Sequence, residues 1–263
     1  MDTRFKQKYF INEDFFNSIS YKQAYYLGLI ASDGCIINDR AVTLSQSGEN
    51  GLFLLKQIKD MLDWTGNFYK SKNAYAMYYS SKKVVHFLND YGIYERKTYN
   101  IEYPKKLPEE LFLYFLRGYF DGDGCLGYYN NGAGQYCFVM TFVGTENFIN
   151  EINRLLPIKG KIKKIERCKN LFEFRVYGEP AKNLYKLLYE STYNNVPIIS
   201  AKQLKYKSIS FKENFYMKYK DIRNIFFEKY NNGEKIMDIS RELKFPFQTL
   251  YAWLKQHKEQ INK

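Results

Sequence analysis

Two ten-residue segments, 90 positions apart, are variants of one pattern. Residues 26–35 read YLGLIASDGC, and residues 116–125 read LRGYFDGDGC. Each segment has a glycine, two large apolar residues and two small or acidic residues, and each ends on Asp-Gly-Cys. Such a repeat marks two copies of one structural unit, so the chain is expected to fold as two similar halves.

The residues before each segment predict that both segments are helical. Ser20 and Gln23 have the spacing of a capping box, which satisfies backbone N–H groups in the first turn of a helix. Pro108 precedes Glu109 and Glu110, and both residue types are favoured in a first turn. Each helix is expected to end at the glycine of Asp-Gly, because glycine tolerates the left-handed conformation that closes many helices. These two glycines are Gly34 and Gly124.

The same order of elements follows each motif. The first half has a predicted hairpin at 35–46, helix at 51–62, hairpin at 67–80 and helix at 82–91. The second half has predicted strands at 125–129 and 135–143, a helix at 145–156, a hairpin at 160–177 and a helix at 180–191. Alternating apolar residues indicate the strands, and helical spacing of apolar residues indicates the helices. The sequence therefore predicts an α+β fold of two pseudo-symmetric αββαββα repeats, 1–105 and 106–208, whose antiparallel sheets pack through the paired motif helices.

The segment 209–263 differs from both halves because it lacks strand signals. About half of the excess positive charge of the chain lies from residue 205 onward. Two predicted helices, 234–243 and 247–257, are joined by a short turn and form a helix-turn-helix pattern with the second helix as the recognition helix. A plain helical cap on the main domain is the alternative. The apolar residues expected to form its small core are Ile236, Ile239, Leu243, Leu250, Trp253 and Leu254.

The charge of the chain narrows the class of partner. Its 263 residues include 40 Lys and Arg against 28 Asp and Glu, a net charge of +12, which favours a polyanion such as nucleic acid. An A/T-rich genome would produce a similar composition without any such function. The longest apolar run, 24–31, is too short to cross a membrane, and the N-terminus lacks the pattern of a signal peptide. We expect a cytoplasmic protein with reduced cysteines, and the 45% hydrophobic content excludes global disorder.

Asp33 and Asp123 occupy matched positions at the ends of the two predicted helices. A helix C-terminus disfavours an anion, so two matched acids indicate a cation between them. Small residues one turn apart on each helix would let the backbones approach closely, which brings the two carboxylates together. Oxygen ligands without a nearby histidine favour Mg²⁺ or Mn²⁺. The small residues are Gly28, Ser32, Gly118 and Gly122.

The two motifs resemble the paired signature helices of the LAGLIDADG homing endonucleases, in the single-chain type that holds both motifs. The resemblance covers about residues 20–205, and the C-terminal helix-turn-helix-like segment is an extension beyond it. The second motif is close to the consensus. The first departs from it at Ala31, where many members have an acid, but it keeps the final Asp-Gly.

The resemblance implies a set of site residues. Asp33 and Asp123 would bind divalent metal, with Gly34 and Gly124 as accompanying ligands. A basic residue near the end of each half would lie close to the scissile phosphate, and the matching residues are Lys97 and Lys202. Gln46 matches a polar residue that positions solvent, and its counterpart falls near Gly144, so the site is expected to be asymmetric. Asp121 is expected to be a structural hydrogen-bond acceptor.

The resemblance also implies metal-dependent cleavage of both strands of a long, non-palindromic DNA site by a monomer. The strands would read bases in the major groove, and the Lys-rich second hairpins would contact phosphates. Expected base contacts are Asn38, Arg40, Thr43, Gln46, Tyr128, Asn130, Gln135 and Thr141. Expected phosphate contacts are Lys70, Lys72, Lys161, Lys163 and Arg167, and the tail would contribute Gln248, Thr249 and Tyr251.

Three other functions remain open from the sequence. A non-cleaving DNA-binding regulator could share the fold, but it has no need for both Asp33 and Asp123, so their joint retention favours a nuclease. An RNA maturase keeps these acids more often, so their presence does not separate it from a nuclease. A structural protein of A/T-biased composition would not require the doubled motif. A mobile genetic element of a bacterium, a phage or an organelle is the expected context for a homing endonuclease.

Overall fold

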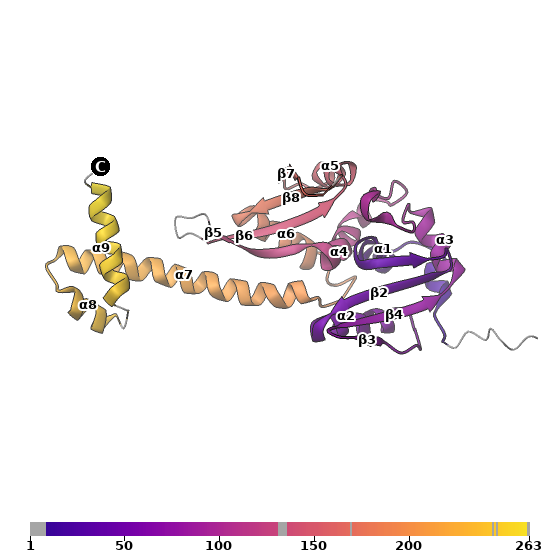
Figure 1. Ribbon diagram of the computed structural model, residues 1–263, viewed down its shortest axis with the longest axis horizontal. Coiled ribbons are helices and arrows are strands. Elements are labelled where there is room, and N and C mark those ends of the chain that lie inside the picture. Colours follow the sequence, from indigo (N-terminus) through magenta and orange to yellow (C-terminus); the bar gives the residue numbers. More distant parts are fainter. Residues whose placement is uncertain (1–8, 131–135, 169, 244, 246, 262–263) are drawn as a thin grey trace, which may run out of the picture. The chain divides into compact units, whose positions relative to one another are not determined.

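The computed structural model describes residues 9–130, 136–168, 170–243, 245 and 247–261, apart from the side chains of 98, 129, 130, 136, 207–220 and 258–261. The chain divides into two compact units, residues 1–207 and 208–263. Unit 1 contains both motifs and both sheets, and unit 2 is helical in its described residues (Figure 1). The boundary between the units falls inside helix α7, Ala201–Asn231.

The two halves of unit 1 repeat one order of elements, as the sequence predicts. The first half contains α1 (Tyr21–Asp33), β1 (Gly34–Ile37), β2 (Ala41–Ser47), α2 (Gly48–Met61), β3 (Tyr69–Ser71), β4 (Ala74–Ser80) and α3 (Lys82–Asp90). The second contains α4 (Phe112–Asp123), β5 (Cys125–Asn130), β6 (Tyr136–Gly144), α5 (Glu146–Leu155), β7 (Lys161–Lys164), β8 (Phe172–Tyr177) and α6 (Gly178–Tyr189). The predicted α+β class and pseudo-symmetric αββαββα repeats are confirmed.

Each half has one four-stranded antiparallel sheet. The strand orders are β1-β2-β4-β3 and β5-β6-β8-β7, so corresponding strands hold corresponding places. One face of each sheet packs against helices and supplies the core, because alternate side chains of a strand point to opposite faces. The buried residues of the helix-covered faces include Val42, Leu44, Met77, Tyr79, Phe138, Met140, Phe142, Phe174 and Val176. The opposite, open faces carry exposed and half-buried residues such as Thr43, Tyr78 and Lys161.

The two halves meet along α1 and α4, which lie side by side (Figure 1). A Cβ atom added to Gly28 would overlap the backbone carbonyl oxygen of Phe115, and one added to Gly118 would overlap that of Tyr25. A Cβ atom on Gly122 would overlap the Ser32 side chain. The small residues of both motifs therefore allow the helix backbones to touch, as the sequence predicts.

Both motif helices end at the predicted glycines, but the expected reason is wrong. Gly34 has φ −80° and ψ 159°, and Gly124 has φ −63° and ψ 147°, so both are extended rather than left-handed. Glycine is required here for space, since a Cβ atom would overlap Ile30 at the first position and Phe120 at the second. The extended conformation lets the chain pass directly from each helix into the first strand of its sheet.

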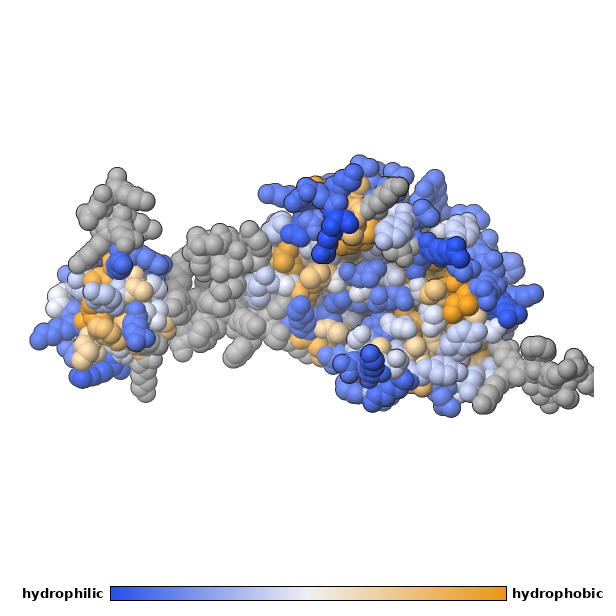
Figure 2. Space-filling model, in the orientation of Figure 1, coloured by the Kyte–Doolittle hydropathy of each residue, from blue (hydrophilic) through white to orange (hydrophobic). Residues whose placement is uncertain are grey.

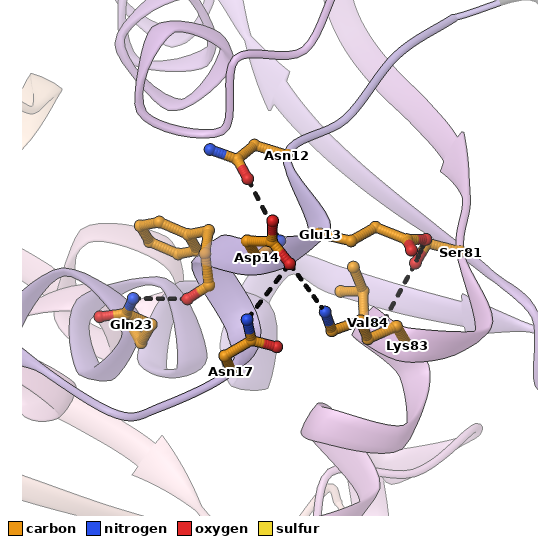
Figure 3. Close-up of polar contacts among 9 residues, drawn as sticks. Asn12, Glu13, Asp14, Asn17, Gln23, Ser81, Lys83 and Val84 are labelled. Atoms are coloured by element: carbon orange, nitrogen blue, oxygen red, sulfur yellow. Dashed lines mark hydrogen bonds and ion pairs between the residues drawn. The ribbon is translucent and has the colours of Figure 1, made fainter.

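A short 3₁₀ helix, η2 (Glu13–Phe16), fastens the N-terminal segment to the first half (Figure 3). Gln23 of α1 donates from Nε2 to the carbonyl oxygen of Phe15 at 2.5 Å, and Ser81 donates from Oγ to Glu13 Oε1 at 2.5 Å. Lys83 of α3 pairs with Asp14 at 3.3 Å. Gln23 also completes the predicted capping box with Ser20. The start of α1 is therefore tied to η2, and η2 is tied to α3.

Unit 2 has its own small core. Its described helices after α7 are α8 (Ile236–Glu242) and α9 (Phe247–Ile261), which correspond to the two predicted tail helices. The core consists of Ile239, Leu250, Trp253 and Leu254 together with Phe226 from α7. Ile236 and Leu243 pack against it. The sequence prediction missed Phe226 and the 31-residue length of α7.

No helix within the described ranges has the length and hydropathy that a membrane span requires.

Candidate active site

Asp33 and Asp123 are the last residues of the two packed helices, which brings both carboxylates to the same end of the α1–α4 interface. Asp33 is half-buried and accepts a hydrogen bond at Oδ2 from Gln46 Nε2 at 2.5 Å. Its carboxyl carbon lies next to Gly122, one residue before Asp123. Asp123 exposes more of its surface than Asp33 does. The sequence predicted this pairing from the matched positions and the small residues.

The site disfavours two negative charges in the absence of a cation. Burial and the nearby charge of Asp123 together raise the pKa of Asp33 to about 6, against the hydrogen bond from Gln46 and the charges of Lys202 and Lys97, which lower it. Burial also raises the pKa of Asp123, and the charges of Lys97 and Lys202 oppose that rise. Protons or cations therefore stabilise this pair.

The two predicted lysines lie at this pair of carboxylates. Lys97 donates from Nζ to the carbonyl oxygen of Gly34, and Lys202 donates from Nζ to that of Gly122 at 3.0 Å. Burial lowers the pKa of both ammonium groups, against the attraction of the surrounding acids and cysteine thiols. The structure thus brings together two carboxylates and two lysines from four separate parts of the sequence.

The polar residue beside the carboxylates is present in only one half. Gly34 pairs with Leu44 across β1 and β2, and Cys125 pairs with Thr141 across β5 and β6. Counting along these registers, the position of Gln46 in the first half corresponds to Gly144 in the second. The predicted asymmetry is therefore present: Gln46 contacts Asp33, and glycine has no side chain with which to contact Asp123.

Asp121 belongs to a buried charge network rather than to the carboxylate pair. It accepts hydrogen bonds from the Tyr25 hydroxyl at 2.9 Å and the Tyr189 hydroxyl at 2.5 Å. The guanidinium of Arg117 lies over both tyrosine rings, 5.5 Å and 5.3 Å from their centroids. Asp121 and Arg117 are buried charges of opposite sign on one face of α4, which supports the structural role expected for Asp121.

Sequence reasoning missed Arg117. The first motif has Leu27 at the matching position, so the repeat gave no sign that a charge was needed there. The available signal was an arginine in the middle of the apolar run 111–120, since a buried arginine needs hydrogen-bond partners for its donors. Arg117 donates to Thr192 Oγ1 at 3.0 Å, to the Val196 carbonyl oxygen at 2.8 Å and to the Ile198 carbonyl oxygen.

The donor set at the carboxylates fits a hard divalent cation. It offers carboxylate oxygens of Asp33 and Asp123, and the backbone carbonyls of Gly34 and Gly122 already accept from ammonium groups, which shows that these oxygens attract positive charge. The carbonyl oxygen that Lys202 meets belongs to Gly122, and the metal-ligand roles expected for Gly34 and Gly124 stay predictions. In the described part of the chain, no three His, Cys, Asp or Glu side chains cluster as a metal site, so a bound ion would need these carbonyls, water or substrate oxygens as further ligands.

The predicted base contacts fall into two groups by strand register. Thr43 and Thr141 lie on the open faces, and Asn38 and Arg40 are exposed in the β1–β2 turn. Tyr128 shares the helix-covered face of sheet B with Phe138, its cross-strand partner, and it is half-buried. The pairing register puts Asn130 on that same face, but its side chain is outside the described set, and Gln135 lies outside the described residues altogether.

The predicted phosphate contacts are exposed. Lys161 and Lys163 lie on the open face of sheet B, and Arg167 lies in the β7–β8 loop. Lys72 lies in the β3–β4 turn, and Lys70 lies over the ring of Tyr75, 5.4 Å from its centroid. Figure 2 shows hydrophilic residues gathered over the β7–β8 hairpin on the visible face. In unit 2, Gln248 and Tyr251 are exposed near the start of α9, and Thr249 is half-buried.

Sequence reasoning also missed residues of the open faces. Tyr69 and Tyr78 lie on the open face of sheet A and are 57% and 39% exposed. Arg175 lies on the open face of sheet B, where it pairs with Glu173 at 2.6 Å. Strand alternation could have identified all three, had the register of β4 and β8 been known.

Solved structures share this architecture. The LAGLIDADG homing endonuclease I-LtrWI bound to target DNA superposes with a TM-score of 0.54 at 16% identity, over 80% of this chain and 93% of that one. I-SmaMI bound to cleaved DNA superposes with a TM-score of 0.54 at 14% identity, over 78% of this chain and 91% of that one. I-SmaMI bound to its uncleaved DNA target in the presence of calcium ions has a TM-score of 0.51 at 15% identity, over 78% of this chain and 93% of that one.

The chain has the single-chain, two-motif LAGLIDADG fold. Among curated proteins, the probable translation initiation factor IF-2 of Methanocaldococcus jannaschii is 28% identical over 233 residues, which cover 84% of this chain and 17% of that protein. The chain therefore spans about a sixth of the length of this relative. No family model matches the chain. Within the LAGLIDADG fold, the candidate active site lies where the two signature helices end.

Proposed function

We propose that this protein is a site-specific DNA endonuclease that makes a metal-dependent double-strand break in a long, non-palindromic target. The observation that carries the proposal is the pair Asp33 and Asp123, held together at the end of two touching helices with a lysine on each side. A fold alone needs no second acid at this place, since the pair of carboxylates costs stability without a cation. One chain supplies both carboxylates and both lysines, so we propose that it acts as a monomer.

The chain's own residues have distinct tasks in this proposal. Asp33 and Asp123 hold Mg²⁺ or Mn²⁺, with the nearby glycine carbonyls as further oxygen donors. The metal, when bound, supplies positive charge that activates water and stabilises the leaving 3′ oxygen. Gln46 fixes the orientation of the Asp33 carboxylate through its amide. Lys97 and Lys202 place ammonium groups beside the position of the scissile phosphates, where they offset the charge that develops during cleavage.

The DNA duplex would lie along the open faces of the two sheets. Alternate strand residues reach base edges from such a face, and the exposed lysines and Arg167 contact phosphates. The two open faces differ in chemistry: Thr43, Tyr69 and Tyr78 are uncharged, whereas Lys161, Lys163 and Arg175 are positive. A duplex read by two different faces has no reason to be palindromic, which supports an asymmetric target.

Cleavage of a target library tests the proposal. In Mg²⁺ the protein should convert some plasmids to linear DNA, and in Ca²⁺ it should bind them without cutting. Asp33→Asn and Asp123→Asn should each reduce double-strand cleavage at least about 100-fold, because they remove charge that the metal requires, and should leave binding in Ca²⁺ within about threefold. Asp90→Asn is the matched control, since Asp90 makes only an exposed pair with Lys106 at 3.9 Å.

Intact plasmids across the whole library, with DNA binding retained, would instead establish a non-cleaving regulator. Tight binding to intron RNA with no cleavage of DNA would favour an RNA maturase. The helical tail, unit 2, supports the regulator as the second candidate, because its exposed residues at the start of α9 fit a recognition helix.

A further inference from the structure

Each site lysine follows a segment without a strand that comes after the last helix of its repeat: Lys97 begins a 3₁₀ helix, Lys97–Tyr99, and Lys202 is the second residue of α7. We call residues 91–101 the first strap, which carries Lys97, and residues 190–202 the second strap, which carries Lys202. Neither strap belongs to a sheet or to the motif helices. The position of each lysine therefore depends on what holds its strap.

The second strap is held by the first repeat. Gln57 of α2 donates from Nε2 to the Ile199 carbonyl oxygen at 2.9 Å and accepts at Oε1 from the Ile199 N–H at 2.9 Å. The amide of Gln57 thus donates to and accepts from the backbone of Ile199, which lies three positions before Lys202. Ser200 and Gln203 then begin α7 with reciprocal side-chain bonds to backbone N–H groups, at 3.0 Å and 3.4 Å.

The first strap is held by the second repeat. Thr145, the N-cap of α5, donates from Oγ1 to the Ile101 carbonyl oxygen at 2.6 Å, four positions after Lys97. Both residues are buried. Helix α5 is the second repeat's counterpart of α2, since each follows the second strand of its sheet. The arrangement is therefore reciprocal: α2 of the first repeat holds the second strap, and α5 of the second repeat holds the first strap.

The second strap has an additional anchor inside its own repeat. Arg117 of α4 binds the Val196 and Ile198 carbonyl oxygens from inside the second repeat, while Gln57 binds Ile199 from the first. The matching residue of the first motif is Leu27, whose apolar side chain cannot make such bonds. The backbone just before Lys202 is thus fixed from both sides.

We infer that Gln57 and Thr145 are positioning residues, each of which aligns the site lysine of the opposite repeat. A shift of about 1 Å in a group that stabilises a transition state costs about 100-fold in rate, so a strap released at one point would impair its own lysine and spare the other. The inference deepens the proposed nuclease function and rests on it. Its signature is a loss of cleavage rate that is confined to one DNA strand.

Strand-specific cleavage of end-labelled target DNA tests this inference in the full chain. Gln57→Leu removes both bonds to Ile199 at similar volume, and it should slow the cutting of one strand at least tenfold, so that nicked DNA accumulates. The slowed strand should be the one slowed by Lys202→Met. Thr145→Val should slow the opposite strand, the one slowed by Lys97→Met, whereas Thr145→Ser should keep the wild-type rates because it keeps the hydroxyl.

Two controls separate positioning from damage to the fold. Asp60→Asn alters an exposed residue of the same helix as Gln57 and should leave both strand rates unchanged. Binding of the target in Ca²⁺ should stay within about twofold for every variant. Equal slowing of both strands, or slowing of the same strand by Gln57→Leu and Thr145→Val, would overturn the inference.

Amine labelling followed by mass spectrometry gives a readout that does not require nuclease activity. Lys202 is half-buried and bonded to Gly122, so its labelling should rise at least threefold in Gln57→Leu while that of Lys97 stays constant. Thr145→Val should show the reverse pattern. If the wild-type protein cuts no DNA, the proposed function fails and the labelling still decides the inference. Unchanged labelling of Lys202 in Gln57→Leu would refute it.

Discussion

Asp33 is subject to opposite demands from stability and from the proposed chemistry. Burial and the neighbouring Asp123 raise its pKa to about 6, because both disfavour its charged form. Metal binding requires that same charged form. The neighbouring groups reduce the conflict without removing it: the amide of Gln46 and the charges of Lys97 and Lys202 favour the carboxylate.

The stability of the metal-free protein should therefore depend on pH through Asp33. A raised folded-state pKa means that the contribution of Asp33 is fully present below the unfolded pKa and is lost as the pH rises through about 6. In EDTA at pH 7, Asp33→Asn should be more stable than wild type by about 1–3 kcal/mol, after allowance for partial exposure. At pH 4 the wild type and Asp33→Asn should have similar free energies of unfolding.

Denaturant unfolding at both pH values measures this difference, and added Mg²⁺ should raise the stability of the wild type only. If wild type were the more stable protein at pH 7 in EDTA, the charges of the lysines would outweigh the burial of the Asp33 carboxylate, which would contradict its raised pKa.

The helix pair α1–α4 places the site, because its backbone contact determines how closely the carboxylates approach. Gly28 and Gly118 each face a backbone carbonyl of the other helix, where no flexible side chain can move aside. Glycine usually weakens a helix by about 1 kcal/mol relative to alanine. These two positions are therefore exceptions to helix propensity, imposed by packing.

Gly118→Ala should destabilise unit 1 by at least about 2 kcal/mol, although alanine is the better helix former, because its Cβ would overlap the Tyr25 carbonyl oxygen. Gly127→Ala is the matched control, since its Cβ would lie 3.9 Å from the Val139 side chain in ordinary contact. Chemical denaturation compares the two. A stabilising effect of Gly118→Ala would contradict the close approach of the helices.

The molecule as a whole combines a compact unit that holds the candidate site with a smaller basic helical unit. Unit 1 contains both sheets and all four central site residues, and unit 2 has a separate core around Phe226 and Trp253. Because unit 2 has a core of its own, we expect that its removal would leave the site in unit 1 intact. The excess of basic residues in unit 2 fits a contribution to binding through phosphate contacts.

Truncation after Lys207 should therefore weaken DNA binding and spare the chemistry. We expect the affinity at 0.1 M salt to fall at least tenfold and the slope of log K against log salt to decrease by at least about one, because fewer phosphates are neutralised. Single-turnover cleavage at saturating protein should stay within about threefold of the full chain. Unchanged affinity and slope would show that unit 2 does not bind DNA.

Much of the fold could be predicted from local signals, and the failures have physical causes. Strands and helices followed from residue alternation and helical spacing, and the repeat doubled every signal. The 31-residue length of α7 was missed, although Phe215, Ile222 and Phe226 recur at helical spacing within it. Tyr128 was predicted to reach DNA, but register puts it on the helix-covered side, and register depends on which residues pair across strands.

The sequence by itself determined the two repeats, the order of their elements and the matched acids, because these depend on neighbours along the chain and on one internal comparison. Only the tertiary structure decided which distant groups meet. The contacts of Gln57 with Ile199 and of Thr145 with Ile101, and the burial of Arg117 beside Tyr25 and Tyr189, join segments whose proximity no local pattern encodes. Hydrogen bonds between such segments depend on how the helices and sheets pack, so no pattern of neighbouring residues predicts them.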